Sequence, residues 1–189
     1  MMKKIITIIA LCISFISHSQ KRELPVDTIV ITNHTTTIKG EKISYQAQTG
    51  TQPVWDIDGN PIASLFYTYY KRTDIKNVNE RPLIFSFNGG PGSASVWMHL
   101  AYTGPKILKI DEEGYPTQPY GYKNNPNSIL DIADIVFVNP VNTAYSRILE
   151  VDGKKADREK FFGINEDIEY LAEWLNTFVS RKQRWESPK

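Results

Sequence analysis

Polar and apolar residues alternate early in this chain, and the alternation predicts strands. Residues 42–47 place Ile43 and Tyr45 on one face at a period of two, as in a half-buried strand. Residues 35–38 precede them across a turn that contains glycine, so the pattern predicts a hairpin. Residues 21–33 carry little pattern and are expected to form an N-terminal arm.

A second hairpin is predicted where Asp58-Gly59-Asn60-Pro61, a strong turn sequence, separates the stretches 54–57 and 62–70. The second stretch is rich in aromatic residues, which are more typical of a sheet than of a ligand platform. These residues are Phe66, Tyr67, Tyr69 and Tyr70. Residues 72–81 are polar and charged, and are expected to form a surface loop.

Further along, short apolar runs are followed by turns and helical patterns. Residues 83–87 are apolar enough to predict a strand buried on both faces, and residues 135–138 predict a second buried strand. Between them we expect a short helix over 95–102, a strand over 106–110 and a long loop over 115–127.

The clearest helix is predicted over 165–185. Asn165 is a candidate cap, and Glu166 and Asp167 lie where the helix dipole favours acids. The bases that the dipole favours near the end of the helix are Arg181, Lys182 and Arg184. Its predicted apolar face consists of Ile168, Leu171, Ala172, Leu175, Phe178 and Val179. The order of elements predicts an α/β sheet preceded by antiparallel hairpins, and a further strand is expected after Pro188.

Composition and charge agree with a folded globular chain. Of the 189 residues, 41% are hydrophobic and 23% are charged, and the formal net charge is +1. This balance and the lack of a basic stripe argue against a nucleic-acid partner. No metal-ligand spacing surrounds His34, and no cofactor is expected. The pattern does not indicate an oligomeric state.

Residues 1–19 have the parts of a secretory signal: Lys3 and Lys4, an apolar segment, and small residues at a plausible cleavage site. An uncleaved membrane anchor is the alternative. A lipoprotein signal at Cys12 is disfavoured because the preceding Leu11 is bulky. We therefore expect export to the periplasm or the extracellular space, with no membrane span after cleavage.

The candidate chemistry lies in Asn88-Gly89-Gly90-Pro91-Gly92-Ser93-Ala94-Ser95, directly after the first buried strand. Such a glycine turn brings bare backbone N–H groups up to a reacting atom, as an oxyanion hole requires. A phosphate cradle is the alternative, but Pro91 removes an N–H and no lysine follows. Ser93 and Ser95 lie on no Gly-x-Ser-x-Gly elbow and are expected to pack, and His99 is expected to be a partly buried helix histidine.

This stretch resembles the oxyanion-loop signature of the serine carboxypeptidase family, whose members have the α/β-hydrolase fold. Three further segments resemble its secreted bacterial branch, and the resemblance runs from about Thr35 to the end. These segments are 59–70, 124–141 and 161–189. The resemblance implies that the Gly90 N–H is one oxyanion donor, that Asn88 binds the C-terminal carboxylate of a peptide substrate, and that Gly89 and Gly92 let the backbone approach.

In that family the nucleophile strand comes immediately after the segment at which this sequence ends, and the Asp and His of the triad lie further on. Residues 20–189 are therefore expected to be the N-terminal portion of an α/β-hydrolase domain, inactive alone. The family's tryptophan two residues before the loop is Ser86 here, and its Asp-Pro-Val-Gly-Thr-Gly run becomes residues 139–144, beginning with Asn139. An esterase, an acyltransferase and a non-catalytic secreted binding module remain as alternatives.

Overall fold

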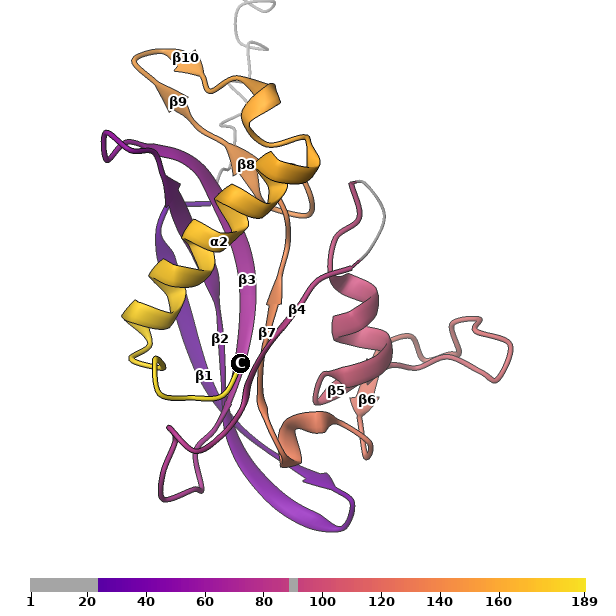
Figure 1. Ribbon diagram of the computed structural model, residues 1–189. Helices are drawn as coiled ribbons and strands as arrows, with labels where there is room; N and C mark the ends of the chain where they lie inside the picture. Colours follow the sequence, from indigo (N-terminus) through magenta and orange to yellow (C-terminus); the bar gives the residue numbers. More distant parts are fainter. Residues whose placement is uncertain (1–23, 89–91) are drawn as a thin grey trace, which may run out of the picture.

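The computed structural model describes residues 24–88 and 92–189, and the predicted signal segment lies outside these residues. One twisted sheet forms the centre of the molecule, with α2 on one face and shorter helical turns on the other (Figure 1). Its order is β1 (Thr28–Ile38), β2 (Glu41–Trp55), β3 (Pro61–Arg72), β7 (Asp134–Val138) and β4 (Leu83–Ser86). A short strand, β8 (Arg147–Ile148), also pairs with β3.

Both predicted hairpins are present. β1 and β2 pair antiparallel from Thr28↔Thr51 to Ile38↔Glu41, and β2 continues into the second hairpin with β3. The expectation of an arm over 21–33 was wrong where the structure describes it, because Thr28 already begins β1. The β-branched residues of 28–31 favour this strand although they do not alternate with polar ones.

β7 and β4 are the parallel pair of the sheet, which confirms the predicted α/β class. All five residues of β7 are buried, because apolar clusters cover both faces of this central strand. The prediction that residues 83–87 are buried on both faces was wrong. β4 is the last strand of the described sheet, and Ile84 keeps 36% of its surface exposed.

Helix α2 (Ile164–Arg181) packs its aromatic side against β2 and β3. The buried residues of the helix are Tyr170, Trp174, Phe178 and Val179. The predicted apolar face was therefore partly wrong, since Ile168 is 62% exposed. The predicted cap was also wrong: Gly163 holds the N-cap position, and no side chain caps the helix. The acidic first turn is confirmed.

A second apolar cluster lies on the opposite face of the sheet. It consists of Ile38, Ile43, Tyr45, Tyr70, Leu130, Ile135 and Phe137. The expected short helix is present as a π-helical turn, η1 (Met98–Thr103), and η2 (Ile129–Asp131) also lies on this side. Together with α2, these turns give the sheet a helical layer on each face (Figure 1).

Two small hairpins lie outside the main sheet. β5 (Lys106–Leu108) pairs with β6 (Tyr122–Asn124), so the expected loop over 115–127 contains a strand, and the predicted strand over 106–110 is shorter. β9 (Glu150–Val151) pairs with β10 (Lys154–Lys155) and precedes the 3-10 turn η3 (Arg158–Lys160). The predicted aromatic residues of β3 do build the sheet: Tyr67, Tyr69 and Tyr70 are buried.

Candidate active site

The predicted loop begins at the carboxyl end of β4, beside the end of β7. Asn88 lies two residues after the end of β4, and Gly92, the next described residue, has a φ of 75°, in the left-handed region that glycine adopts freely. Gly89 and Gly90, the other two predicted site residues, lie outside the described residues.

Ser95 ties the two ends of the loop to β7. Its hydroxyl donates to the Val138 carbonyl oxygen, and it accepts a hydrogen bond of 3.3 Å from the Asn88 N–H. Its own N–H donates to Asn139 Oδ1 at 3.0 Å. Ser95 is only 1% exposed, so the prediction that it packs is confirmed. That it does not act as a nucleophile stays a prediction.

The Asn139 side chain extends this network from β7 to β3. Its Nδ2 donates to the Phe66 carbonyl oxygen at 3.1 Å, while its Oδ1 accepts the Ser95 N–H. Ser146 completes the arrangement, because its hydroxyl donates to the Asn139 carbonyl at 2.7 Å and accepts the Phe66 N–H at 2.8 Å. An amide is suited to this position because it donates on one side and accepts on the other. A carboxylate could only accept.

The Asn88 side chain is engaged within the loop. Its Nδ2 donates to Ser93 Oγ at 2.7 Å. This bond orients the amide group within the loop. The predicted role of Asn88 in binding a carboxylate stays a prediction.

His99 lies beneath this region, on η1, and is the partly buried histidine that the sequence predicted. Its ring stacks on Phe137 with centroids 4.5 Å apart, and its Nε2 lies 2.7 Å from the Tyr70 hydroxyl. Burial lowers the pKa of His99 from 6.5 to about 4. The imidazole is therefore neutral at physiological pH.

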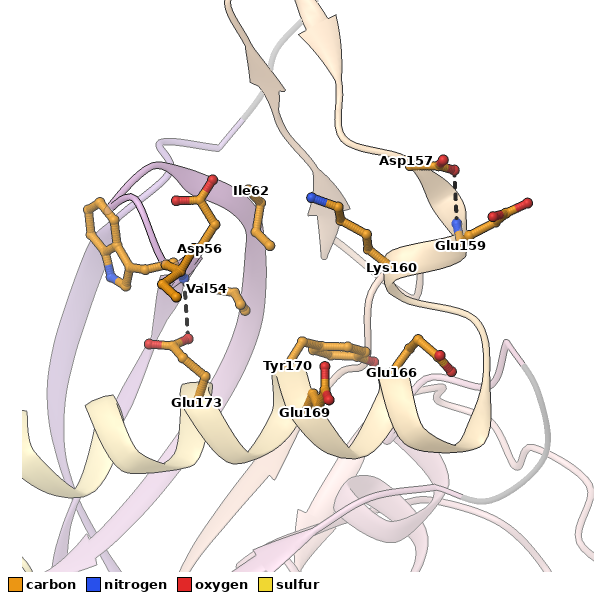
Figure 2. A pocket seen from close by; sticks show the side chains of 12 residues that line it. Val54, Asp56, Ile62, Asp157, Glu159, Lys160, Glu166, Glu169, Tyr170 and Glu173 are labelled. Atoms are coloured by element: carbon orange, nitrogen blue, oxygen red, sulfur yellow. Dashed lines mark hydrogen bonds between the residues drawn. The ribbon is translucent and has the colours of Figure 1, made fainter.

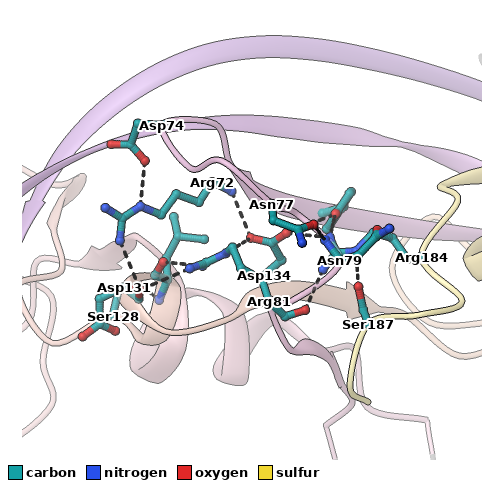
Figure 3. Close-up of polar contacts among 12 residues, drawn as sticks. Arg72, Asp74, Asn77, Asn79, Arg81, Ser128, Asp131, Asp134, Arg184 and Ser187 are labelled. Carbon is teal, nitrogen blue, oxygen red and sulfur yellow. Dashed lines mark hydrogen bonds and ion pairs between the residues drawn. The ribbon is translucent and has the colours of Figure 1, made fainter.

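At the opposite, amino ends of β4 and β7, the contacts are ionic. Asp134 is fully buried, and its Oδ2 accepts from Arg184 Nη1 at 2.6 Å while its Oδ1 accepts from Arg81 Nε at 3.1 Å (Figure 3). The Arg72 N–H donates to Oδ1 as well, at 3.0 Å. The carboxylate thus joins β3, β7 and the chain after α2.

This ionic cluster changes two of the sequence predictions. Arg184 was expected to complement the helix dipole, but it lies beyond α2 and is only 1% exposed. Residues 72–81 were expected to be a surface loop, yet the Arg81 side chain turns inward to Asp134, and the Arg72 N–H donates to the same carboxylate. Arg184 also donates from Nε to Ser187 Oγ at 2.7 Å, and the Leu83 N–H donates to the Pro188 carbonyl at 2.8 Å. The last residues are thereby held beside the start of β4.

The described residues also line a cavity of about 610 Å³ between the β2–β3 turn, η3 and the start of α2 (Figure 2). Acidic side chains surround it, and several of them are already engaged: Glu173 accepts the Trp55 N–H, and Asp157 accepts the Glu159 N–H. Asn88, the predicted site residue that the structure describes, does not line it. Within residues 24–88 and 92–189, no group of side chains is suited to hold a metal ion, and no helix is long and apolar enough to cross a membrane.

The family model described as serine carboxypeptidase matches residues 43–185, which include the loop, the Ser95–Asn139 network and Asp134 with its two arginine partners. The chain belongs to the serine carboxypeptidase family. It is 30% identical over 127 residues to serine carboxypeptidase-like 36 of Arabidopsis thaliana, a match that covers 66% of this chain and 24% of that protein. It is also 30% identical over 127 residues to the pheromone-processing carboxypeptidase KEX1 of Saccharomyces cerevisiae, over 66% of this chain and 16% of that one.

A solved structure of the same yeast family member, a prohormone-processing carboxypeptidase, superposes with a TM-score of 0.54 at 25% identity. The superposition covers 71% of this chain and 28% of that structure. The likeness supports the α/β-hydrolase type of fold. This serine carboxypeptidase family member spans about a quarter or less of the curated relatives described above.

Sequence reasoning did not find the contacts of Asn139 in this family member. The residue drew attention only because it replaces the aspartate of the family's run. Its position after a buried strand was a usable signal, since side chains there lie at the edge where parallel strands end. The partners of the amide, on β3 and after the glycine loop, could not be inferred from the residues near it.

Proposed function

We propose that this chain is the N-terminal part of a secreted serine-type carboxypeptidase, which removes residues from peptide C-termini through an acyl-enzyme. One observation carries the proposal. The loop that starts at Asn88 lies at the carboxyl end of β4, beside β7. It falls within residues 43–185, which the serine carboxypeptidase family model matches. Reacting groups of open α/β sheets gather at this edge.

In this proposal the Gly90 N–H is one of two donors to the oxyanion of the tetrahedral intermediate. Such donors are effective when they are held in place before the reaction, and loss of one costs about a hundredfold or more in rate. The bonds of Ser95 to Asn88, Val138 and Asn139 support this role, because they fix where the loop leaves the sheet and where it returns. The Asn88 amide then serves the substrate's C-terminal carboxylate.

We assign the nucleophilic serine, the acid and the base to a segment that follows Lys189. The Leu83–Pro188 hydrogen bond supports this assignment, because it directs the chain along the outer edge of β4. A strand paired there places a serine at its carboxyl end next to the loop. The proposal includes export through residues 1–19.

Two proteins test the proposal: the 189 residues alone, and the same chain extended through the next Gly-x-Ser-x-Gly sequence and the rest of the reading frame. The extended protein is expected to release the C-terminal residue of an N-blocked dipeptide and to react with a fluorophosphonate. The 189 residues alone are expected to do neither. Turnover by the short chain, or an extended chain that folds but never reacts, contradicts the proposal.

Asn88→Ala in the extended protein separates a carboxypeptidase from an esterase or an acyltransferase. We expect KM for a peptide with a free carboxylate to rise at least tenfold, since a charge-assisted hydrogen bond is lost. The same peptide with an amidated C-terminus is the control, and its turnover should not change. Equal losses on both substrates would mean that Asn88 does not recognise the carboxylate.

A further inference from the structure

The outer edge of β1 is a long strand edge with no neighbour among the described residues. β1 runs from Thr28 to Ile38 at one end of the sheet order, and β2 pairs with it along its other side without a register shift (Figure 1). An unpaired edge presents a row of backbone N–H and C=O groups that can bind another strand.

This edge lacks the features that usually prevent such pairing. Proteins protect edge strands with charges, prolines, bulges or short length. Residues 28–38 contain no Lys, Arg, Asp, Glu or Pro, and their register with β2 is uninterrupted. Ile29, Val30 and Ile31 are 42%, 63% and 50% exposed, so apolar side chains flank the edge on both faces.

We propose that β1 pairs antiparallel with β1 of a second copy of this chain, centred on Asn33, so that the two sheets become continuous. In this register the aliphatic half of each strand lies opposite the threonine half of the other. Ile29 faces Thr37, Val30 faces Thr36 and Ile31 faces Thr35. Opposite residues share one face of an antiparallel pair, and β-branched pairs stabilise it.

Charges just beyond the strand select this register. Asp27 and Lys39 lie immediately before and after β1, and antiparallel pairing about Asn33 brings each next to the other residue of the second copy. Their side chains are 48% and 60% exposed, although each already has one partner: Arg181 for Asp27 and Asp131 for Lys39. A parallel pairing would place like charges together, and it would not give the two-fold symmetry that closes a dimer.

Sedimentation of the full 189-residue chain over a range of concentrations tests the dimer. We expect reversible dimerisation, and Ile31→Lys should weaken it at least tenfold because each copy then places a charge on the paired edge. Ile168→Lys is the matched control, since Ile168 is equally apolar and is 62% exposed on α2. A wild-type chain that remains monomeric, or a dimer that Ile31→Lys leaves unchanged, overturns the proposal.

A disulfide test reads the register. In a Cys12→Ser background, which removes the only native cysteine, Asn33→Cys should form intermolecular disulfides with a mild oxidant, because the two positions meet on the two-fold axis. Opposite Cα atoms lie about 5 Å apart, within disulfide range. Ile31→Cys is the control: its two copies are four residues apart along the strands, about 14 Å. Equal cross-linking of both variants overturns this register. Hydrogen exchange of the β1 amides is a second measurement: if an unrelated β-strand peptide protects them and a second copy of the chain does not, the edge binds another partner and the dimer proposal is overturned.

Discussion

The two ends of the β4–β7 pair are held by different chemistry. At the amino ends, the buried carboxylate of Asp134 joins the buried guanidinium of Arg184 to the partly buried guanidinium of Arg81. At the carboxyl ends, the Ser95–Asn139 network makes comparable connections with hydroxyls, amides and backbone groups only. Both networks tie β7 to neighbouring segments that are distant in sequence, yet only one of them uses charge.

The use of ion pairs at one end and neutral groups at the other follows from the different contacts that each end makes. A buried ion pair fixes geometry well once all its partners are present, and the amino ends have no other task in the proposed function. At the carboxyl ends, the proposed reaction builds negative charge on the substrate. The family's run has aspartate at the position of Asn139, so a carboxylate is compatible with that reaction. In this chain the group must both donate to the Phe66 carbonyl and accept the Ser95 N–H, which suits a neutral amide.

The comparison predicts its largest effect at the charged end. Asp134→Asn leaves Arg184 and Arg81 without their counter-charge, and we expect the free energy of unfolding to fall by about 4 kcal/mol. Urea denaturation measures the change. Glu113→Gln, on an exposed turn, is the control and should leave the midpoint unchanged. A loss below about 1 kcal/mol would show that the cluster is not coupled to folding.

A negative charge placed in the Ser95–Asn139 network should lower the stability of the fold. Asn139→Asp keeps the shape of the side chain but turns a carboxylate toward the Phe66 carbonyl, and we expect a loss of about 3 kcal/mol at pH 7. A protonated carboxyl donates again, so the deficit relative to wild type should shrink as the pH falls below the carboxyl pKa. Asn127→Asp, at an exposed position, is the control. If the loss of stability in Asn139→Asp does not depend on pH, the amide's donation to the Phe66 carbonyl is not what the substitution removes.

His99 gives a smaller, pH-dependent test of the same region. Because its folded-state pKa of about 4 lies below the unfolded value of 6.5, the unfolded chain binds the proton first. Stability is therefore complete above pH 6.5 and declines as the pH falls toward 4. Between pH 7 and pH 5 we expect about 2 kcal/mol of this loss to come from His99. In His99→Gln this part of the pH dependence of the free energy of unfolding should be absent. If the free energy of unfolding of the variant falls with pH as steeply as that of the wild type, other groups cause the loss.

The smallest predicted effect tests a neutral member of the charged cluster. Ser187→Ala removes the acceptor for Arg184 Nε but leaves both ion pairs of Asp134 intact. We expect a loss of about 1 kcal/mol in urea denaturation. A loss as large as that of Asp134→Asn would mean that the segment after α2, and not the charge, limits stability.

Much of the fold could be predicted from residues that lie close together in the chain. The hairpin turns, the fully apolar strand β7 and the acidic start of α2 each have a local signature, because turn geometry, burial and the helix dipole act over a few residues. The glycine loop was also recognisable, as was the resemblance to the family to which the chain belongs. The roles of Gly89 and Gly90 remain predictions.

Other features depended on the order of the strands. Residues 83–87 and 135–138 have similar apolar patterns, but β7 became central and β4 an edge because of their neighbours in the sheet. Asp134 meets Arg184 across 50 positions, and Asn139 meets Phe66 across 73. Periodicity reports how a segment is buried and not which segment buries it. Sequence alone therefore determined the elements and the loop, whereas the tertiary structure decided which end of the sheet is charged and which is neutral.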